Sequence, residues 1–317
     1  MKSRYPNGFA GGAVIRDMPH HEAHPGKVFW VGNNASVLDG EKAASDQADA
    51  GSFLKPLASI DYAVGLCKAN RGDVIYVRPN YSETITSASA IDIDVAGVSV
   101  IGLGHGSAMA TIEFNHAAAT VAIGADDVVL QNLKLNASIT GVVDGVIVED
   151  GVNNAVIRNC LFDVDATGTD EFIDCISLVN NNSRCVVEDC VMDMGLGGAV
   201  SAIHADADTA FLVIRNNVIR GDFSTANIVG DTTLSTNVDI QGNLLENGIG
   251  GDLNAQPCIE LLTGSTGTIR DNYLVCNLAT KAASVVADTC MLFENYYNED
   301  ISSAATGGII GAASADD

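Results

Sequence analysis

The sequence predicts an all-β fold, a right-handed parallel β-helix (a single-stranded solenoid) of about eight or nine coils. Three observations predict it: a short apolar pattern recurs, its period lies in the twenties, and five of the six prolines precede the repeats. A recurrence of this length is typical of a solenoid in which each repeat forms one coil. Proline is excluded because every strand in stacked parallel coils donates hydrogen bonds to its neighbours.

Each repeat is an apolar strand, a step at a small or polar residue, and a second apolar strand. We expect left-handed backbone angles at the step, which Gly and Asn adopt readily, and stacked Asn side chains can bond one another from coil to coil. Successive steps are 30, 27, 30, 27, 26, 29 and 24 residues apart. The steps fall on Gly102, Asn132, Asn159, Asp189, Asn216, Gly242, Asp271 and Asn295.

An apolar residue recurs two positions before each step. Alternate positions of a strand share one face, so these residues should stack as an inward-facing ladder. We expect insertions at residues 166–173 and 246–256 to bulge from the turns, which accounts for the unequal spacing. The ladder consists of Val100, Leu130, Ile157, Val187, Ile214, Ile240, Ile269 and Phe293.

The chain divides into three predicted segments: an N-terminal arm (residues 1–54), the β-helix (residues 55–300) and a C-terminal tail (residues 301–317). A helix at residues 58–70, with Ser59 as its N-cap, should cover the first coil, because an open coil exposes a sheet edge. The arm is broken by prolines and glycines, so it cannot build a core of its own and needs a surface on which to lie.

Charge is distributed unevenly along the chain. There are 16 Lys and Arg against 40 Asp and Glu, a net charge of −24. Residues 1–78 hold nine basic and eight acidic residues (net +1), which leaves seven basic and 32 acidic residues (net −25) for residues 79–317. This balance argues against a nucleic-acid partner, because neutralising phosphates needs clustered cations. The neutral front is the better candidate for contact with another macromolecule.

The sequence shows neither a secretion signal nor an apolar run of membrane-spanning length, which predicts a cytoplasmic origin and no membrane partner. The eight cysteines form no metal-binding spacing, so we expect reduced, buried thiols and no cofactor. Cys160 and Cys190 share a column in adjacent coils. Parallel side chains stacked in register fit disulfide geometry poorly, and we expect these two to be small core residues.

Several stretches near the front resemble a family of tailed-phage virion proteins that have a pectate-lyase-like, right-handed parallel β-helix. The likeness covers the front third of the chain, and beyond it only the coil pattern is shared. KVFWVGN (27–33), SIDYAVGLCKANRGDVIYVRPNYSETI (59–85) and VAGVSVIGLGHG (95–106) match the β-helix part, and RYPNGFAGG (4–12) and HPGKVFWV (24–31) are similar to the N-terminal arm.

The resemblance implies a structural protein of a bacteriophage particle, a decoration or cement protein that stabilises capsomer junctions. It implies a place on the outer capsid surface of the virion after synthesis in the host bacterial cytoplasm, with the major capsid protein and further copies of itself, as a homotrimer, for partners. The alternative is a tail spike or another β-helix protein that binds or cleaves polysaccharide. The arm residues expected to touch the capsid are Tyr5, Phe9, Val28, Phe29 and Trp30.

Cleavage of polysaccharide by hydrolysis needs two carboxylates held about 5–10 Å apart. Acidic residues abound in the repeats, so pairs arise by chance, and aromatic residues make up only 5% of the chain. The sequence therefore predicts a protein without enzymatic activity. The acidic residues considered were Asp163, Asp165, Asp170, Glu171, Asp174, Glu188, Asp189 and Asp193.

Basic residues that a lyase could use are few. Arg158, Arg215 and Arg270 fall in one column beside the step. We expect them to form a ladder on the outer face, opposite acidic neighbours such as Glu188, rather than an active site.

A weak calcium candidate lies in DVDATGTDEFID (163–174). Its spacing places Asp163, Asp165 and Asp174 at positions 1, 3 and 12 of a calcium-loop register. Asp stands where the bidentate Glu belongs, and no helix flanks the loop. The sequence therefore predicts no metal site, with a solvated acidic insertion as the simpler interpretation.

His204, Asp206 and Asp208 alternate along one predicted strand, which gives them a common face. The simpler interpretation is that these three residues form an exposed polar face.

Overall fold

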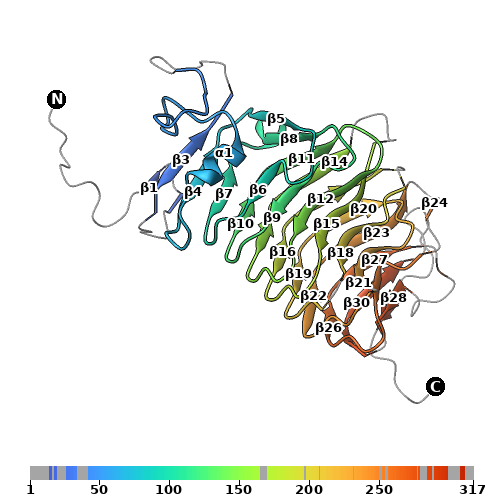
Figure 1. Ribbon diagram of the computed structural model, residues 1–317. Helices are drawn as coiled ribbons and strands as arrows, with labels where there is room; N and C mark the ends of the chain where they lie inside the picture. Colours follow the sequence, from blue (N-terminus) through green and yellow to red (C-terminus); the bar gives the residue numbers. More distant parts are fainter. Residues whose placement is uncertain are drawn as a thin grey trace.

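Three parallel sheets wind into a β-helix in the computed structural model, and this confirms the predicted fold class (Figure 1). The solenoid makes about 7 turns, slightly fewer than the eight or nine coils predicted. The structure describes residues 26–33, 42–164 and 170–298, apart from 196–197, 207, 231, 250–251, 254–255, 277, 279–283 and 288, together with 14–15, 18–19 and 308–310.

Sheet 1 has ten strands and contains the first strand of each repeat. Neighbouring strands are parallel and in register throughout. In spatial order they are β29 (Met291–Phe293), β26 (Gly267–Arg270), β22 (Val238–Gln241), β19 (Val213–Arg215), β16 (Val186–Glu188), β13 (Val156–Arg158), β10 (Val129–Gln131), β7 (Ser99–Gly102), β4 (Val74–Val77) and β3 (Val28–Val31).

Sheet 2 contains the second strand of each repeat and is parallel except for two short strands, β31 and β24, which pair antiparallel with β30 and β23. The β23–β24 hairpin occupies the insertion predicted at 246–256. The strands are β31 (Gly308–Ile310), β30 (Asn295–Asn298), β27 (Tyr273–Val275), β23 (Leu244–Ile249), β20 (Val218–Gly221), β17 (Val191–Asp193), β14 (Leu161–Val164), β11 (Leu133–Ala137), β8 (Ala110–Phe114) and β5 (Ser82–Ile85), with β24 (Asp252–Leu253) at the side of β23.

Sheet 3 closes each coil, and its strands come from the stretches between repeats, where the sequence shows no recurring pattern. Its strands are β28 (Val285–Val286), β25 (Ile259–Leu261), β21 (Ala226–Gly230), β18 (Ser201–Ala205), β15 (Phe172–Leu178), β12 (Val142–Val148), β9 (Val121–Ile123) and β6 (Ile91–Ile93). Outside the three sheets, β1 (Val14–Ile15) and β2 (Met18–Pro19) pair antiparallel, and η1 is a short 3-10 helix (Gly106–Ala108).

The inward ladder of sheet 1 is confirmed for seven of its eight predicted members, from Val100 to Ile269, all of which are buried and stacked in register. The eighth is wrong. Phe293 is 48% exposed on the outer face, because the register partner of Ile269 in the last coil is Leu292. The sequence pattern assigned the aromatic Phe293 to the core, whereas in the structure the inward-facing residue is its neighbour Leu292.

Left-handed backbone angles occur at six of the eight predicted steps, Gly242 with φ 65° among them; the prediction is wrong at Gly102, which lies inside β7, and the left-handed glycine there is Gly104, with φ 96°. Asn132, Asn159, Asp189, Asn216 and Asp271 have φ between 52° and 56°. In the last repeat the left-handed residue is Glu294, with φ 46°, and not Asn295. The same one-residue error in register that misplaced Phe293 explains this difference.

A buried asparagine ladder lies one position after the step, where it joins the last four coils. The Nδ2 atom of Asn217 donates to Oδ1 of Asn243 at 3.0 Å, and the pairs Asn243–Asn272 and Asn272–Asn295 repeat the bond at 2.9 Å. All four residues are buried. Hydrogen bonds between asparagine side chains of successive coils were predicted at the step. The buried bonds of this kind lie one position after the step.

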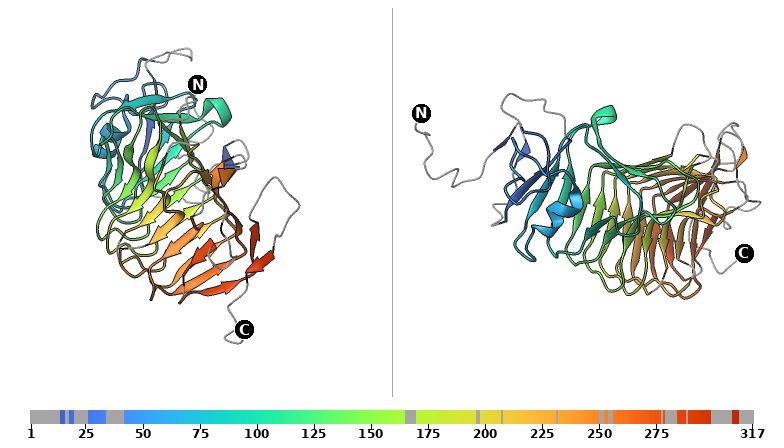
Figure 2. Two further views of the ribbon diagram at one scale, coloured as in Figure 1. Left: turned by 90° about the vertical axis from the view of Figure 1, so that its right-hand side faces the viewer. Right: turned by 45° about the horizontal axis from the view of Figure 1, so that its top comes forward.

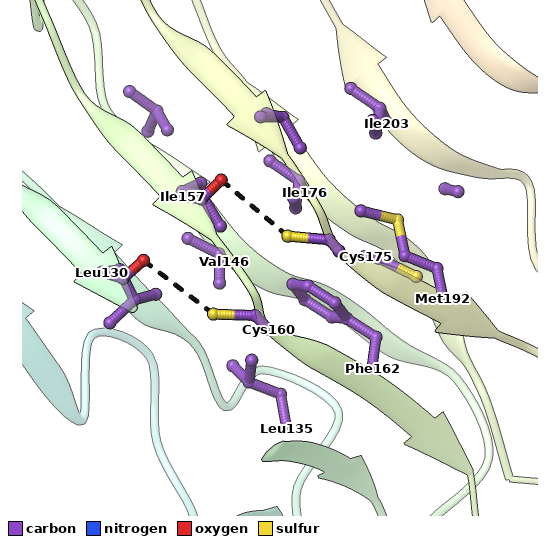
Figure 3. Close-up of a cluster of buried hydrophobic side chains, with 14 of the residues drawn as sticks. Leu130, Leu135, Val146, Ile157, Cys160, Phe162, Cys175, Ile176, Met192 and Ile203 are labelled. Atoms are coloured by element: carbon purple, nitrogen blue, oxygen red, sulfur yellow. Dashed lines mark hydrogen bonds between the residues drawn. The ribbon is translucent and has the colours of Figure 1, made fainter. Parts of the chain in front are cut away.

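Cys160 and Cys190 occupy the same column as this ladder in earlier coils and are buried. The Cys160 thiol donates to the carbonyl oxygen of Leu130 at 3.9 Å (Figure 3), and the Cys190 thiol donates to that of Ile157 at 3.8 Å. All eight cysteines are free, as predicted. Burial raises the pKa of the Cys175 thiol well above its ordinary value, which keeps this thiol protonated inside the core.

The predicted capping helix is α1 (Ile60–Gly65), shorter than the 58–70 expected. Ser59 caps it as predicted, its hydroxyl accepting from the Tyr62 amide at 3.3 Å. The helix lies beside β3, β4 and β6, the first strands of the solenoid (Figure 2). β3 belongs to the stretch predicted as an arm, yet it pairs in parallel with β4 and so extends sheet 1. Among the described residues, no helix has the length and apolar character needed to cross a membrane.

Candidate active site

The predicted capsid-contact residues fall in different environments. Tyr5 and Phe9 lie outside the described residues. Val28 is exposed, whereas Phe29 is only 9% exposed and packs in the core of the first coil. Phe29 is therefore a core residue and not a surface contact, because it is the inward neighbour of Val28 and Trp30 on β3.

Trp30 lies on the outer side of β3 and is half-buried in an aromatic cluster. Its ring meets Phe53 edge-on at 4.8 Å and tilts over Tyr76 at 5.2 Å. The Arg78 guanidinium covers the Phe53 ring at 5.2 Å. Contact of this cluster with another macromolecule stays a prediction.

The weak calcium candidates are not brought together. Asp163, in sheet 2, forms an ion pair of 2.8 Å with Lys134. Asp174 lies in sheet 3, and Asp165 lies outside the described residues. Within the part of the chain that the structure describes, no group of three or more His, Cys, Asp or Glu side chains is placed to hold a metal ion.

The arginine ladder lies on the outer face of sheet 1, as predicted. Arg215 forms an ion pair with Glu188, the register partner on the preceding strand, at 2.5 Å. Arg158 donates to the Gln131 side chain at 3.0 Å. Both arginines therefore contact the side chain of the preceding coil on the outer face of sheet 1.

Two carboxylates, of which only Asp174 was among the candidate residues of the sequence, lie side by side on sheet 3. Asp144 on β12 and Asp174 on β15 are register partners on adjacent parallel strands. Cys175 and Ile176, which follow Asp174, are both fully buried, so the strict alternation of the strand is broken there. Asp174 consequently reaches His204, the outward residue of the next strand, β18.

The Asp174 carboxylate is held from the next coil. The Ser201 hydroxyl donates to its Oδ1 atom at 2.6 Å, and His204 Nδ1 lies 3.3 Å from its Oδ2 atom. Ser201 is fully buried and Asp174 nearly so. Two partners on one strand therefore fix both oxygens of this carboxylate.

Asp144 titrates in an unusual range. Burial is the main cause, followed by the negative charge of Asp174, and together with Asp206 they raise the pKa of Asp144 to about 6 from an ordinary 3.8. A hydrogen bond from Ser177 and the proximity of His204 oppose this shift. His204 and Asp206, interpreted as a plain polar face, thus belong to the surroundings of this carboxylate.

The arrangement has the parts that acid–base hydrolysis of a glycosidic bond requires. A carboxylic acid with a pKa near neutrality can donate a proton to a leaving oxygen, and a second carboxylate can serve as base or nucleophile. Adjacent parallel strands are about 4.8 Å apart, close to the separation of about 5–5.5 Å between the two carboxyl groups of retaining glycosidases. Asp144 and Asp174 are 30 residues apart, a separation that also occurs between successive steps of the repeat. This spacing is the one signal in the sequence that could have paired them.

No protein-family model matches the sequence, and no curated protein matches it. Among solved structures, the chain is similar to one described as the catalytic domain of GH87 alpha-1,3-glucanase in complex with nigerose, with 14% sequence identity and a TM-score of 0.22. The match covers 84% of this chain and 66% of that one, slightly less than two thirds of its length.

The prediction that this chain has no enzymatic activity is corrected. Sheet 3 places two carboxylates, those of Asp144 and Asp174, as register partners on adjacent strands, and the first of them has a raised pKa; the abundance of acidic residues in the sequence gave no means of selecting this pair.

Proposed function

We propose that this protein binds and hydrolyses a polysaccharide on the outer face of sheet 3. The observation that carries the proposal is the in-register pair of Asp144 and Asp174, in which the first has a pKa of about 6 and the second is held by two hydrogen-bonding partners. Strongly shifted carboxyl groups beside a second carboxylate cluster at catalytic sites.

The two carboxylates take different roles in this proposal. Asp144 is the general acid, since a group with this pKa is still partly protonated near neutral pH and can protonate the leaving oxygen. Asp174 acts as the base that activates water or as the nucleophile. Ser201 and His204 are positioning residues, which keep the Asp174 oxygens in place as the reaction proceeds.

An extended substrate fits the position of the pair within the sheet. β9 and β6 lie on one side of β12 and β15, and β18, β21, β25 and β28 lie on the other. A polymer lying along the solenoid would therefore meet further strands on both sides of the reacting bond. This favours cleavage within a chain over removal of a single terminal sugar.

Release of reducing ends from soluble polysaccharides tests the proposal. The wild-type protein should release them, and Asp144→Asn should be slower by about a hundredfold or more, the usual contribution of a general acid. Asp193→Asn, which neutralises an exposed carboxylate on sheet 2, is the matched control and should keep wild-type activity. Equal loss in both variants, or no release by the wild type from any polymer, would count against the proposal.

The resemblance of the front of the chain to phage virion proteins is compatible with this activity in a tail spike. We therefore propose a tail-associated, polysaccharide-cleaving protein in place of a capsid cement. Association with the major capsid protein, a trimeric state and a place on the outer capsid surface stay predictions. Mass spectrometry of purified tails and capsids would distinguish the two locations.

A further inference from the structure

Basic side chains are distributed unequally over the three sheets. All eight strands of sheet 3 are described, and their sequences contain neither Lys nor Arg; their one imidazole is that of His204. Sheet 1, by contrast, carries Arg158 and Arg215, and sheet 2 carries Lys134 and Arg220. The face that bears the candidate active site is therefore the one whose strands lack permanent cations.

Acidic side chains, in contrast, are spread along sheet 3. Its strands carry Asp92 on β6, Asp144 on β12, Asp174 on β15 and Glu260 on β25. A ligand on this face therefore meets carboxyl groups at the catalytic pair, including the Asp174 carboxylate, and also some coils away from it.

A polysaccharide with a carboxylate or sulfate on each sugar would meet repulsion on such a face. Recognition of these groups in proteins depends on Arg and Lys, with Arg forming paired hydrogen bonds to carboxylates. The net charge of −25 on residues 79–317 adds a repulsive field at longer range. Unlike charges steer partners together, and like charges placed against each other select against the wrong partner.

We infer that the substrate of this site is a polysaccharide without acidic groups, made of neutral or amine-bearing sugars. The inference rests on the proposed function, since it concerns the specificity of the same site. The inference excludes polyuronates and sulfated glycans as substrates, an exclusion that the catalytic pair alone does not provide.

The direct test compares polymers that differ in charge. Dextran, laminarin, chitosan and polygalacturonate are incubated with the wild-type protein at low ionic strength, with and without calcium, and reducing ends are measured. We expect release from at least one of the first three and none from polygalacturonate. Polygalacturonate as the preferred substrate would overturn the inference and leave the proposed hydrolysis intact. No release from any polymer would count against both.

A charge-insertion pair tests whether sheet 3 itself causes the exclusion. Val143→Arg places a cation beside Asp144 at a position that is 50% exposed, and Val191→Arg places one on sheet 2 at a position that is 41% exposed. At low salt, binding of oligogalacturonate should tighten about fivefold in Val143→Arg and stay unchanged in Val191→Arg, the effect of one charge at close range in water. Equal gains in both variants would overturn the inference, because they would reflect net charge alone.

Discussion

Ser201 lies directly opposite Asp174 in the register of sheet 3, and its hydroxyl donates to Asp174 Oδ1 at 2.6 Å. Ser201 is fully buried, so this hydrogen bond is shielded from water. Such a bond to an ionised group is stronger than one between neutral groups. The coil that follows the proposed catalytic pair therefore orients one member of that pair, and the site depends on the stacking of the coils.

Removal of that hydrogen bond should slow hydrolysis without abolishing it. In Ser201→Ala, Asp174 keeps His204 but loses its fixed orientation, and we expect kcat to fall about tenfold with little change in KM, the equivalent of roughly 1.4 kcal/mol. Ser201→Thr, which keeps the hydroxyl, should restore most of the rate. Equal losses in both variants would indicate a packing effect instead of a positioning role.

The pH dependence of the rate should follow Asp144. As the general acid it must be protonated, so kcat/KM should be highest below pH 6 and fall above the pKa of about 6 as the proton is lost. The hydrogen bond from Ser177 stabilises the ionised form and lowers this pKa. Ser177→Ala should therefore move the alkaline limb to higher pH. A shift to lower pH, or none, would contradict the assignment of Asp144 as the acid.

The raised pKa of Asp144 also affects stability. A folded-state pKa above the unfolded value means that the folded protein holds this proton more tightly, so ionisation of Asp144 destabilises the fold as pH rises from about 4 through about 6. Asp144→Asn removes that cost, and at pH 7.5 the free energy of unfolding should rise by about 1 kcal/mol, discounted for partial exposure. Thermal unfolding at pH 4 and pH 7.5 measures it; a gain only at pH 4 would contradict this sign.

The asparagine ladder should contribute strongly to the stability of the last coils. Asn243 donates to Asn272 and to the Ile214 carbonyl oxygen, and it accepts from Asn217. Asn243→Ala leaves these buried partners unsatisfied and should lower the free energy of unfolding by about 3 kcal/mol in urea denaturation. Asn136→Ala, on the outer face of sheet 2, is the control and should change it by less than about 0.5 kcal/mol.

The register of the last coil gives a further prediction. Ile269→Ala removes a fully buried member of the inward ladder and should cost about 2–5 kcal/mol, whereas Phe293→Ala truncates an exposed side chain and should cost less than about 0.5 kcal/mol. Urea denaturation of both variants measures the difference. A larger cost for Phe293→Ala would restore the register that the sequence alone indicated.

Much of sheets 1 and 2 could be predicted because each repeat places the same kinds of residue at the same positions. Ile157 and Ile214 could be assigned to the core because the small or polar step after them marks their position in the coil. The error at Phe293 arose because the last repeat lacks a small or Asn/Asp residue at its step. Glu294 occupies the step there, and Glu rarely takes left-handed angles. The apolar residues on both sides of the strand then allowed either register.

The candidate active site could not be predicted in the same way, because it lies on the strands between repeats. Asp144 and Asp174 are neighbours only through the register of sheet 3, and insertions of different length separate that sheet from the repeat pattern. The shifted pKa of Asp144 results from burial, which depends on how the coils stack. Composition gave many acidic residues and no means of choosing between them.

A structure of Asp144→Asn bound to an oligosaccharide from the preferred polymer tests the central claim most directly. The sugar chain should lie across β12 and β15, with one glycosidic oxygen within hydrogen-bonding distance of residue 144 and the adjoining sugar beside Asp174. A sugar chain bound only elsewhere, for instance over the Trp30 and Phe53 rings on sheet 1, would contradict the assignment of sheet 3 as the active site.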